Sequence, residues 1–538
     1  MAQETVSTTV GAVVARLFNR ALGQIVTWIL PAFASLLIIL LAAKLTNFYY
    51  THAWASAHFA TIARFFATHG IIGTHGIPIE NNDPLTSEPD RYLHWPPFFF
   101  YVLSLVLRVF PDSIRAMHLF MATVAIANAV VMWRVTSVFF KPRAAIVCGS
   151  AFLLMPATLR YGLALLPVNL AVLEVSVAVL FMLRYLQGAD TGRETSRDLG
   201  LSTLAFFLAC ITSWEPFLAL PGLFLAYWFD RRSVVLKMCF SWAFAAMAAG
   251  GSILAIYSLS DPTFFRDLWS IFTFRVGLTQ YLPLPTRVHP VEGQLAIDGG
   301  GAFSSIGAFV LIYVVRTQEF CGSLGIMGFF ALLLTAFRRH LGIPNKLLAA
   351  LLLPFCTFWL GWAVVMQNHY LVHQYQLVLA TPVLAIAIAS LDSLLEESRL
   401  IAQDDWLRES LAVLTKIALP CALVFLAISA AWVTNAGEDE PKLLASFGRL
   451  IKTEVPAGAI VLTNESSMVP VYYSERHVVR GIPDGAYVDS HLMMIKDLCR
   501  TCSIYLALTR QNEEKFREQL ARMQPVFDDD NFIVKKLN

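Results

Sequence analysis

The chain has 538 residues, of which 57% are hydrophobic and only 14% charged, and its mean hydropathy is +0.60. A soluble domain is nearer a quarter charged, so the composition excludes a set of soluble domains and indicates a polytopic α-helical membrane protein. With 40 Lys and Arg against 38 Asp and Glu, the net charge of +2 shows no basic excess that would indicate nucleic-acid binding.

The chain begins with an amphipathic lead at residues 1–25, which we expect to be cytoplasmic. The first apolar run follows at 26–45, and its spanning length predicts a permanent anchor rather than a removable signal peptide. Further apolar runs are bounded by charged residues, Pro or Gly. They lie near 116–138, 144–160, 168–186, 199–213, 217–229, 234–257, 321–337, 347–366, 373–392 and 411–434.

A short apolar run at residues 96–110 decides how these spans are oriented. It covers only about 15 residues, whereas a helix needs about 20 to cross a bilayer. If it does not cross, the basic loops lie on the same side as the N terminus, as the positive-inside rule requires. Those loops carry Lys141 and Arg143; Arg184, Arg193 and Arg197; Arg231 and Arg232; and Arg338, Arg339 and Lys346. We therefore expect about eleven spans (twelve if 96–110 crosses), with 96–110 in the outer leaflet.

This topology leaves two long loops of the membrane region 26–434 facing outward, at residues 46–115 and 258–320. Segment 52–69 has apolar residues at helical spacing, which predicts an interfacial helix. Segment 261–281 has the same mixed character and precedes a stretch containing Pro and Gly that could act as a lid. Both loops are long enough to build a site.

Residues 435–538 have a different pattern from the membrane region. Strand-like stretches at 459–463 and 503–508 alternate with helical ones at 441–454 and 511–523, which predicts a small extramembrane α/β domain. Cys499 and Cys502 form one CxxC motif there, without a second pair or a flanking redox βαβ unit. The expected state is a local disulfide in an oxidising compartment.

Four stretches of the sequence share the pattern of a known family. They are Ala-Thr-Ile-Ala-Arg-Phe-Phe-Ala-Thr-His-Gly at 60–70, Tyr-Leu-His-Trp-Pro-Pro-Phe-Phe-Phe-Tyr at 92–101, Arg-Tyr-Gly at 160–162, and Val-Tyr-Tyr-Ser-Glu-Arg at 471–476. Together they resemble the GT-C glycosyltransferases. The resemblance is strongest to the protein O-mannosyltransferase-like group (glycosyltransferase family 39-like), which is related to the lipid A aminoarabinose transferase.

The resemblance implies a GT-C-like fold with juxtamembrane helices in the first outward loop. It also implies an inverting transfer of a sugar from a polyprenyl- or dolichyl-phosphate donor to a protein, lipid or glycan acceptor. Such an enzyme would lie in a bacterial inner membrane, with its C-terminal domain in the periplasm. No cofactor is expected, and the residues do not support a divalent metal. The sequence does not indicate an oligomeric state.

The sequence departs from the family's pattern at the proton acceptor of such a transfer. Members of the family commonly carry an acid just after the first span, where this chain has Tyr50-Thr-His-Ala-Trp54. Asp83 and Glu80, in the acidic part of the first outward loop, are the first candidates for the base. His52 is the second, because its imidazole titrates near neutral pH. All three could also be residues without a catalytic role, and solvated loop acids are the simpler account of the first two.

Other polar residues could bind the donor or the acceptor. A leaving phosphate needs cations or hydrogen-bond donors, and an acid inside a span is costly unless it faces protein or water. The candidates are Arg160, Glu174, His94, Arg275, Arg287 and His373. Arg160 could equally anchor a helix end, and Glu174 could pair with Arg160. Glu215, in Trp214-Glu215-Pro216, is best explained as part of a tight turn between two spans.

Two other functions remain open. A transporter would show paired repeats or ionisable groups near the middle of several spans, whereas here the spans are nearly free of charge and the polar residues gather in outward loops. The other possibility is a relative that has lost its base and serves as a non-catalytic membrane subunit.

Overall fold

The computed structural model describes residues 25–48, 52–80, 91–193, 195–276, 345–366, 373–401, 403–434, 439–489 and 502–537, with a few residues between 315 and 330. The chain divides into two compact units. Unit 1 comprises Met1–Ala42, Met121–Leu163 and Pro167–Val433, and unit 2 comprises Ala43–Phe120, Ala164–Leu166 and Thr434–Asn538. Unit 2 thus joins the first outward loop to the C-terminal segment, which the sequence assigns to two different domains.

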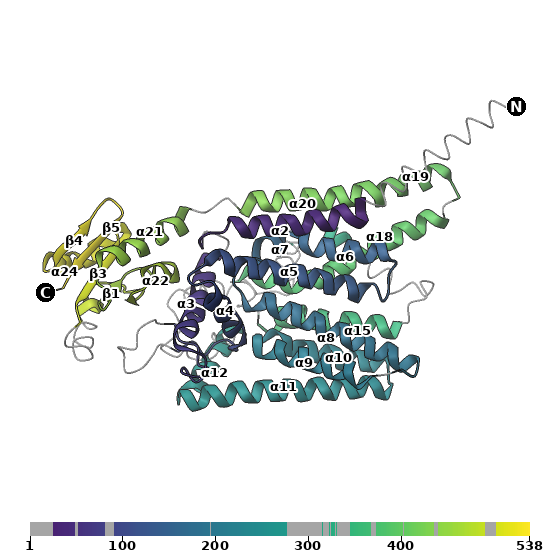
Figure 1. Ribbon diagram of the computed structural model, residues 1–538, viewed down its shortest axis with the longest axis horizontal. Coiled ribbons are helices and arrows are strands. Elements are labelled where there is room, and N and C mark those ends of the chain that lie inside the picture. The colour runs from purple at the N-terminus through teal and green to yellow at the C-terminus, as the bar shows by residue number, and fades with distance from the viewer. Residues whose placement is uncertain are drawn as a thin grey trace, which may run out of the picture. The chain divides into compact units, whose positions relative to one another are not determined.

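Unit 1 is a bundle of helices (Figure 1). Its elements are η1 (Ile25–Ile29), α2 (Leu30–Lys44), α5 (Ile114–Thr136), α6 (Pro142–Leu154), α7 (Pro156–Tyr161), α8 (Pro167–Asp190), α9 (Ser196–Thr212), η2 (Glu215–Leu218), α10 (Ala219–Phe229), α11 (Ser233–Ser260), α12 (Phe264–Arg275), α15 (Asn345–Cys356), η5 (Thr357–Gly361), α16 (Trp362–Val365), η6 (Gln374–Ala380), α18 (Thr381–Ile401), α19 (Asp405–Val413), η7 (Leu414–Ala418) and α20 (Leu419–Thr434). Elements α2 and α5 each run partly into unit 2.

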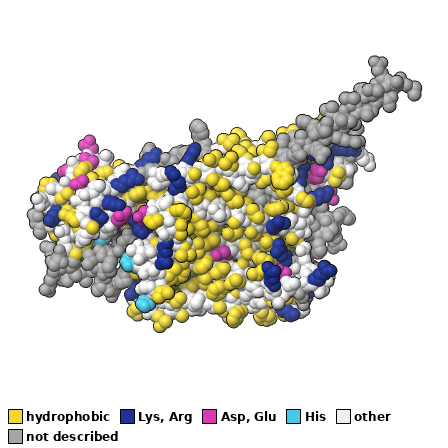
Figure 2. Space-filling model, in the orientation of Figure 1, with side chains coloured by type: hydrophobic (Ala, Val, Ile, Leu, Met, Phe, Trp, Pro, Cys, Tyr) yellow, Lys and Arg dark blue, Asp and Glu magenta, His cyan; other side chains and the backbone are white. Residues whose placement is uncertain are grey.

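Seven helical stretches among the described residues are long and apolar enough to cross a membrane. They are Thr27–Lys44, Ile114–Thr136, Pro167–Asp190, Ser233–Ser260, Leu348–Val365, Tyr375–Leu400 and Trp406–Ala430. Figure 2 shows a broad hydrophobic surface over these helices, with Lys and Arg side chains gathered toward its ends. The chain is therefore a multi-pass integral membrane protein, as its composition predicts.

The structure divides one of the predicted spans and changes the helix type at the start of another. Run 144–160 is interrupted between α6 and α7, because Pro156 has no N–H to continue the helix and occupies the first position of α7 instead. Run 373–392 starts as the tight 3₁₀ turn η6 before it becomes α18. Run 321–337 lies largely outside the described residues, as does the lead at 1–25.

Helix α4 (Phe98–Val109) corresponds to the short run at 96–110. Twelve residues extend about 18 Å, whereas the hydrocarbon core is about 30 Å thick. The helix is thus too short to cross alone, in agreement with the sequence interpretation. The side of the membrane on which it lies remains a prediction.

Unit 2 contains the two helices of the first outward loop and a small α/β domain. Its remaining elements are α3 (Ala53–His69), α21 (Asp439–Glu454), β1 (Ile460–Thr463), α22 (Met468–Ser474), β2 (His477–Val479), β3 (Ile504–Thr509), η8 (Arg510–Phe516), α24 (Arg517–Ala521), β4 (Gln524–Asp528) and β5 (Phe532–Lys536). The strands form one sheet in the order β2-β1-β3-β5-β4. Strand β1 is parallel to both β2 and β3, whereas β5 is antiparallel to β3 and β4.

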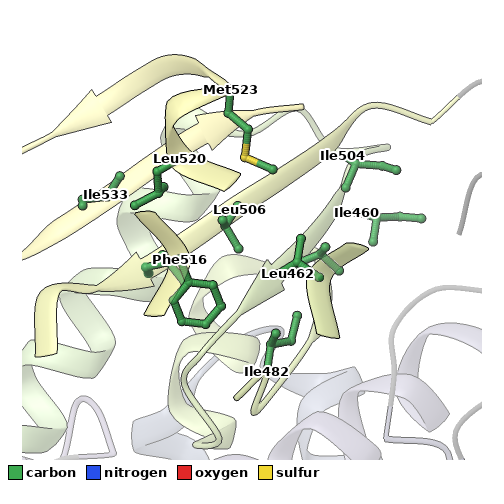
Figure 3. Close-up of a cluster of buried hydrophobic side chains, with 11 residues drawn as sticks. Ile460, Leu462, Ile482, Ile504, Leu506, Phe516, Leu520, Met523 and Ile533 are labelled. Atoms are coloured by element: carbon green, nitrogen blue, oxygen red, sulfur yellow. The ribbon is translucent and has the colours of Figure 1, made fainter. Parts of the chain in front are cut away.

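The predicted α/β domain is therefore present, with a hydrophobic core of its own. Figure 3 shows this core, in which side chains from the strands face side chains from η8 and α24. Leu506 and Phe516 at its centre are fully buried. Cys502, just before β3, is disulfide-bonded, while Cys499 lies outside the described residues.

Helix α3 is more deeply buried than an interfacial helix would be. Of its 17 residues, 12 are buried, because it packs against α4 and α22 within unit 2. Trp54 is an exception, with 39% of its surface exposed. The apolar spacing correctly predicts the helix, but it does not reveal that protein covers most of its circumference.

Candidate functional site

The polar centre of unit 2 is Glu80, which follows α3 at the end of a tight turn. Gly76 has a positive φ of 74°, a conformation that side chains disfavour, and its carbonyl accepts a 2.6 Å hydrogen bond from the Tyr101 hydroxyl on α4. Beyond the turn, Ile79 pairs with Arg91 in an isolated antiparallel bridge. These contacts fix the backbone next to Glu80.

Both carboxylate oxygens of Glu80 meet a basic group. Oε1 lies 3.2 Å from Nε2 of His58 on α3, and Oε2 lies 3.2 Å from Nη2 of Arg480, just after β2. The exposed fractions of the three side chains are only 3% for His58, 14% for Glu80 and 13% for Arg480. Arg480 is held in turn, because its Nη1 donates to the Ser466 carbonyl at 2.8 Å. We call His58, Glu80 and Arg480 the Glu80 cluster.

The electrostatics of this cluster favour the ionised carboxylate. Burial by itself would raise the pKa of Glu80, but the charges of His58, Arg480 and His94 outweigh burial and lower it to about 2. A carboxylate with this pKa, engaged at both oxygens, is a weak proton acceptor. Glu80 is therefore better placed to hold α3 and the C-terminal domain together than to act as a general base.

A second contact joins α3 to the C-terminal domain through Arg64. Its Nη1 donates to the Tyr472 carbonyl at 3.0 Å, and its guanidinium carbon lies 3.6 Å from the centre of the Tyr472 ring. Its Nε also lies 3.2 Å from Asp112. Stacking and directional hydrogen bonding use the planar guanidinium in a way that Lys cannot reproduce. Tyr472 belongs to the stretch 471–476, which therefore has a clear structural role.

His52 occupies the position directly before α3. It has a positive φ of 60°, and burial lowers its pKa to about 4. Its imidazole is therefore neutral at pH 7 and can accept a proton, but less readily than an ordinary histidine. Asp83 and Arg287 lie outside the described residues.

A separate polar cluster occurs in unit 1, around Glu215 at the start of η2. Glu215 is completely buried. Its Oε2 accepts a hydrogen bond from the Ser213 hydroxyl, and its Oε1 accepts one of 2.9 Å from Nε2 of Gln376 on η6. Burial raises the pKa of Glu215, although Ser213, Gln376 and the charge of Arg275 on α12 oppose the rise. We call Ser213, Glu215 and Gln376 the Glu215 cluster.

The remaining candidates of the sequence analysis lie at several places. Glu174 is buried on α8, and its Oε2 has no hydrogen-bond partner among the described residues. Arg160 lies on α7, and His373 directly precedes η6. His94 lies in unit 2, where its charge acts on Glu80. Among the described residues no ion pair joins Glu174 to Arg160, so the expected pairing is not formed.

Sequence reasoning missed the partners of both buried glutamates. His58 has only the signal of a polar residue inside an apolar helix, and Arg480 lies 400 positions from Glu80. Gln376 lies within an apolar run and 161 positions from Glu215. Among the described residues, no group of three His, Cys, Asp or Glu side chains could hold a metal ion.

No protein-family model matches the chain, and no curated protein matches it in sequence. Its fold is nevertheless similar to solved structures. ArnT from Cupriavidus metallidurans bound to undecaprenyl phosphate has a TM-score of 0.63 at 14% identity, over 94% of this chain and 97% of that one. The apo state of the same protein has a TM-score of 0.61 over the same shares, also at 14% identity.

An oligosaccharyltransferase is also similar. The Archaeoglobus fulgidus oligosaccharyltransferase tethered with an acceptor peptide has a TM-score of 0.57 at 13% identity, over 89% of this chain and 68% of that one. The fold of this chain is therefore the GT-C fold, in agreement with the sequence interpretation. At these identities the likeness establishes the fold, while activity has to be argued from the site.

Proposed function

We propose that this protein is a membrane glycosyltransferase that transfers a sugar from a polyprenyl-phosphate donor to an acceptor at the outer face of the membrane. The observation that carries the proposal is the GT-C fold over 94% of the chain, shared with an ArnT structure that binds undecaprenyl phosphate. The concentration of polar residues outside the spans supports an interfacial enzyme rather than a transport path.

The proposed reaction is an inverting displacement at the anomeric carbon. The acceptor's nucleophile forms a bond to this carbon, the bond between the carbon and the carrier phosphate breaks, and the phosphate leaves with the electron pair. A base takes the proton from the nucleophile, while cationic or hydrogen-bonding groups stabilise the leaving phosphate. Arg275, Arg287 and Arg160 are the proposed cations.

Asp83 is the proposed base. Glu80 has both oxygens in ion pairs and a pKa of about 2, and His52 has a pKa of about 4. Glu80 is therefore a weaker proton acceptor than an ordinary carboxylate, and His52 is a weaker one than an ordinary imidazole. In this proposal Glu80 positions the first outward loop and does not take part in proton transfer.

The test is incubation of the purified full chain with a panel of polyprenyl-phosphate sugars, with donor consumption as the measurement. Asp83→Asn should lower turnover by about 10²–10⁴-fold, the usual effect of removing a general base. Glu88→Gln, in the same acidic loop, is the matched control and should retain activity. If no donor is consumed, the non-catalytic subunit or the transporter becomes the better account. If Asp83→Asn remains active and His52→Ala does not, the base is His52.

A further inference from the structure

A cavity opens between η1, α2, α5 and α6 in unit 1. Its volume is about 310 Å³, and its lining is almost entirely apolar. Among the lining residues are Trp28, Ser35, Trp133, Gly149 and Ser150. Gly149 makes the close helix packing possible here, because a Cβ at this position would lie 2.8 Å from the Ala129 carbonyl. Figure 1 shows α2, α5 and α6 in the same part of the bundle.

The cavity lies at the end of the bundle where η1 begins, α5 ends and α6 begins. The positive-inside rule predicts that this end is cytoplasmic. Trp28 is 71% exposed, so the cavity lies next to surface that faces the membrane. Tryptophan at this position suits the depth of the lipid headgroups.

One cationic side chain and one hydroxyl group lie beside the apolar lining of the cavity. Arg134 is exposed, and its guanidinium lies 4.4 Å from the ring centre of Trp133, which lines the cavity. The Ser150 hydroxyl is buried and lacks a hydrogen-bond partner within the described part of the chain. A cation at the rim and an unused hydroxyl inside complement a phosphate and an ester carbonyl above a hydrocarbon chain.

From this geometry we infer that the cavity binds one anionic phospholipid, with an acyl chain between α2, α5 and α6 and its phosphate at Arg134. The opening toward the membrane leaves the second acyl chain in the bilayer. The site uses none of the residues proposed for sugar transfer, so the inference holds whether or not the protein is a glycosyltransferase.

The test uses the full chain purified in detergent and titrated with phosphatidylglycerol or with phosphatidylcholine of the same chains. Bound lipid is counted by native mass spectrometry. One phosphatidylglycerol should bind with about fivefold preference over phosphatidylcholine, because one cation favours the net negative headgroup over one whose phosphate charge is balanced by choline. Arg134→Gln should remove the preference. Arg115→Gln, at the other end of α5, is the matched control and should keep it.

Filling the cavity provides the second arm of the test. Ser35→Trp should weaken phosphatidylglycerol binding by about tenfold or more, because the indole occupies the volume of the acyl chain. Leu36→Trp, one position along the exposed face of α2, should have no effect. If Ser35→Trp fails to fold, Ile146→Trp fills the same cavity from α6.

Three results would overturn the inference. The first is equal binding of the two lipids to wild type, and the second is Ser35→Trp behaving as Leu36→Trp does. Either would indicate only annular lipid around the bundle. The third is displacement of phosphatidylglycerol by an equimolar amount of undecaprenyl phosphate, which would make a polyprenyl carrier the occupant.

Discussion

The two units each contain a buried glutamate, and the two glutamates have opposite properties. Glu80 in unit 2 faces a histidine and an arginine, and its pKa falls to about 2. Glu215 in unit 1 faces a serine hydroxyl and a glutamine amide, and its pKa rises. Burial acts in the same direction on both. The difference shows that the charge of the partners, rather than the depth of the carboxyl group, decides whether it remains ionised.

Removing the charge of Glu80 should have the largest effect on stability. Glu80→Gln leaves Arg480 buried without its counter-charge, and breaking a buried pair in this way costs about 3–5 kcal/mol. The measurement is thermal unfolding of the purified protein in detergent. Glu80→Gln combined with Arg480→Gln should recover part of the loss, because the second change removes the unpaired cation. A loss below about 1 kcal/mol in the single variant would contradict the buried-pair account.

Truncating Glu215 should have the second largest effect. Glu215→Ala leaves Ser213 and Gln376 buried without their acceptor, and each unsatisfied polar group costs about 1–3 kcal/mol. Glu215→Gln keeps the size and an acceptor oxygen, so it should cost much less. The comparison of these two variants by thermal unfolding separates hydrogen bonding from charge. Equal losses would show that the carboxylate charge matters in unit 1 as it does in unit 2.

The pH dependence of stability should have opposite signs for the two glutamates. The folded pKa of Glu80 lies below its ordinary value of 4.5, so its stabilisation is present above pH 4.5 and is lost as pH falls toward 2. The folded pKa of Glu215 lies above 4.5, so its contribution is present below pH 4.5 and is lost as pH rises through the folded pKa.

Unfolding of each variant across pH 2–8 would separate the two contributions. Glu80→Gln should flatten the loss of stability between pH 4.5 and 2, and Glu215→Gln should flatten the loss above pH 4.5. If both buried variants changed the same limb of the curve, the two carboxyl groups would not differ in protonation as the structure indicates.

The sequence predicts the helices and the α/β domain because these depend on local pattern. A run of about 20 apolar residues determines a span, and alternating strand and helix patterns determine the C-terminal domain. Pro156 is a sequence signal for the break between α6 and α7, but the apolar residues on both sides of it predict one continuous span. The long distance in sequence between Glu80 and Arg480 illustrates what local pattern does not contain. Their contact follows from packing α22 against α3, for which the sequence offers no periodic signal.

The same limit applies to the residues proposed for catalysis. Glu80 is one of five acids in the first outward loop, and the composition of this loop does not distinguish a free carboxylate from a paired one. The pairing depends on His58, whose role as a partner follows only once α3 and the turn at Gly76 are placed. Asp83 remains a candidate on sequence alone.

The smallest expected effect concerns an exposed pair in unit 2. Nζ of Lys452 lies 2.6 Å from Oε1 of Glu475, closer than either contact of Glu80, but 47% and 39% of the two side chains are exposed. Water and salt screen such a pair, so Lys452→Gln should cost about 0–1 kcal/mol. Raising the salt concentration should abolish this small difference while leaving the loss in Glu80→Gln largely unchanged. A loss in Lys452→Gln comparable to that in Glu80→Gln would mean that contact distance, rather than burial, controls the strength of ion pairs in this unit.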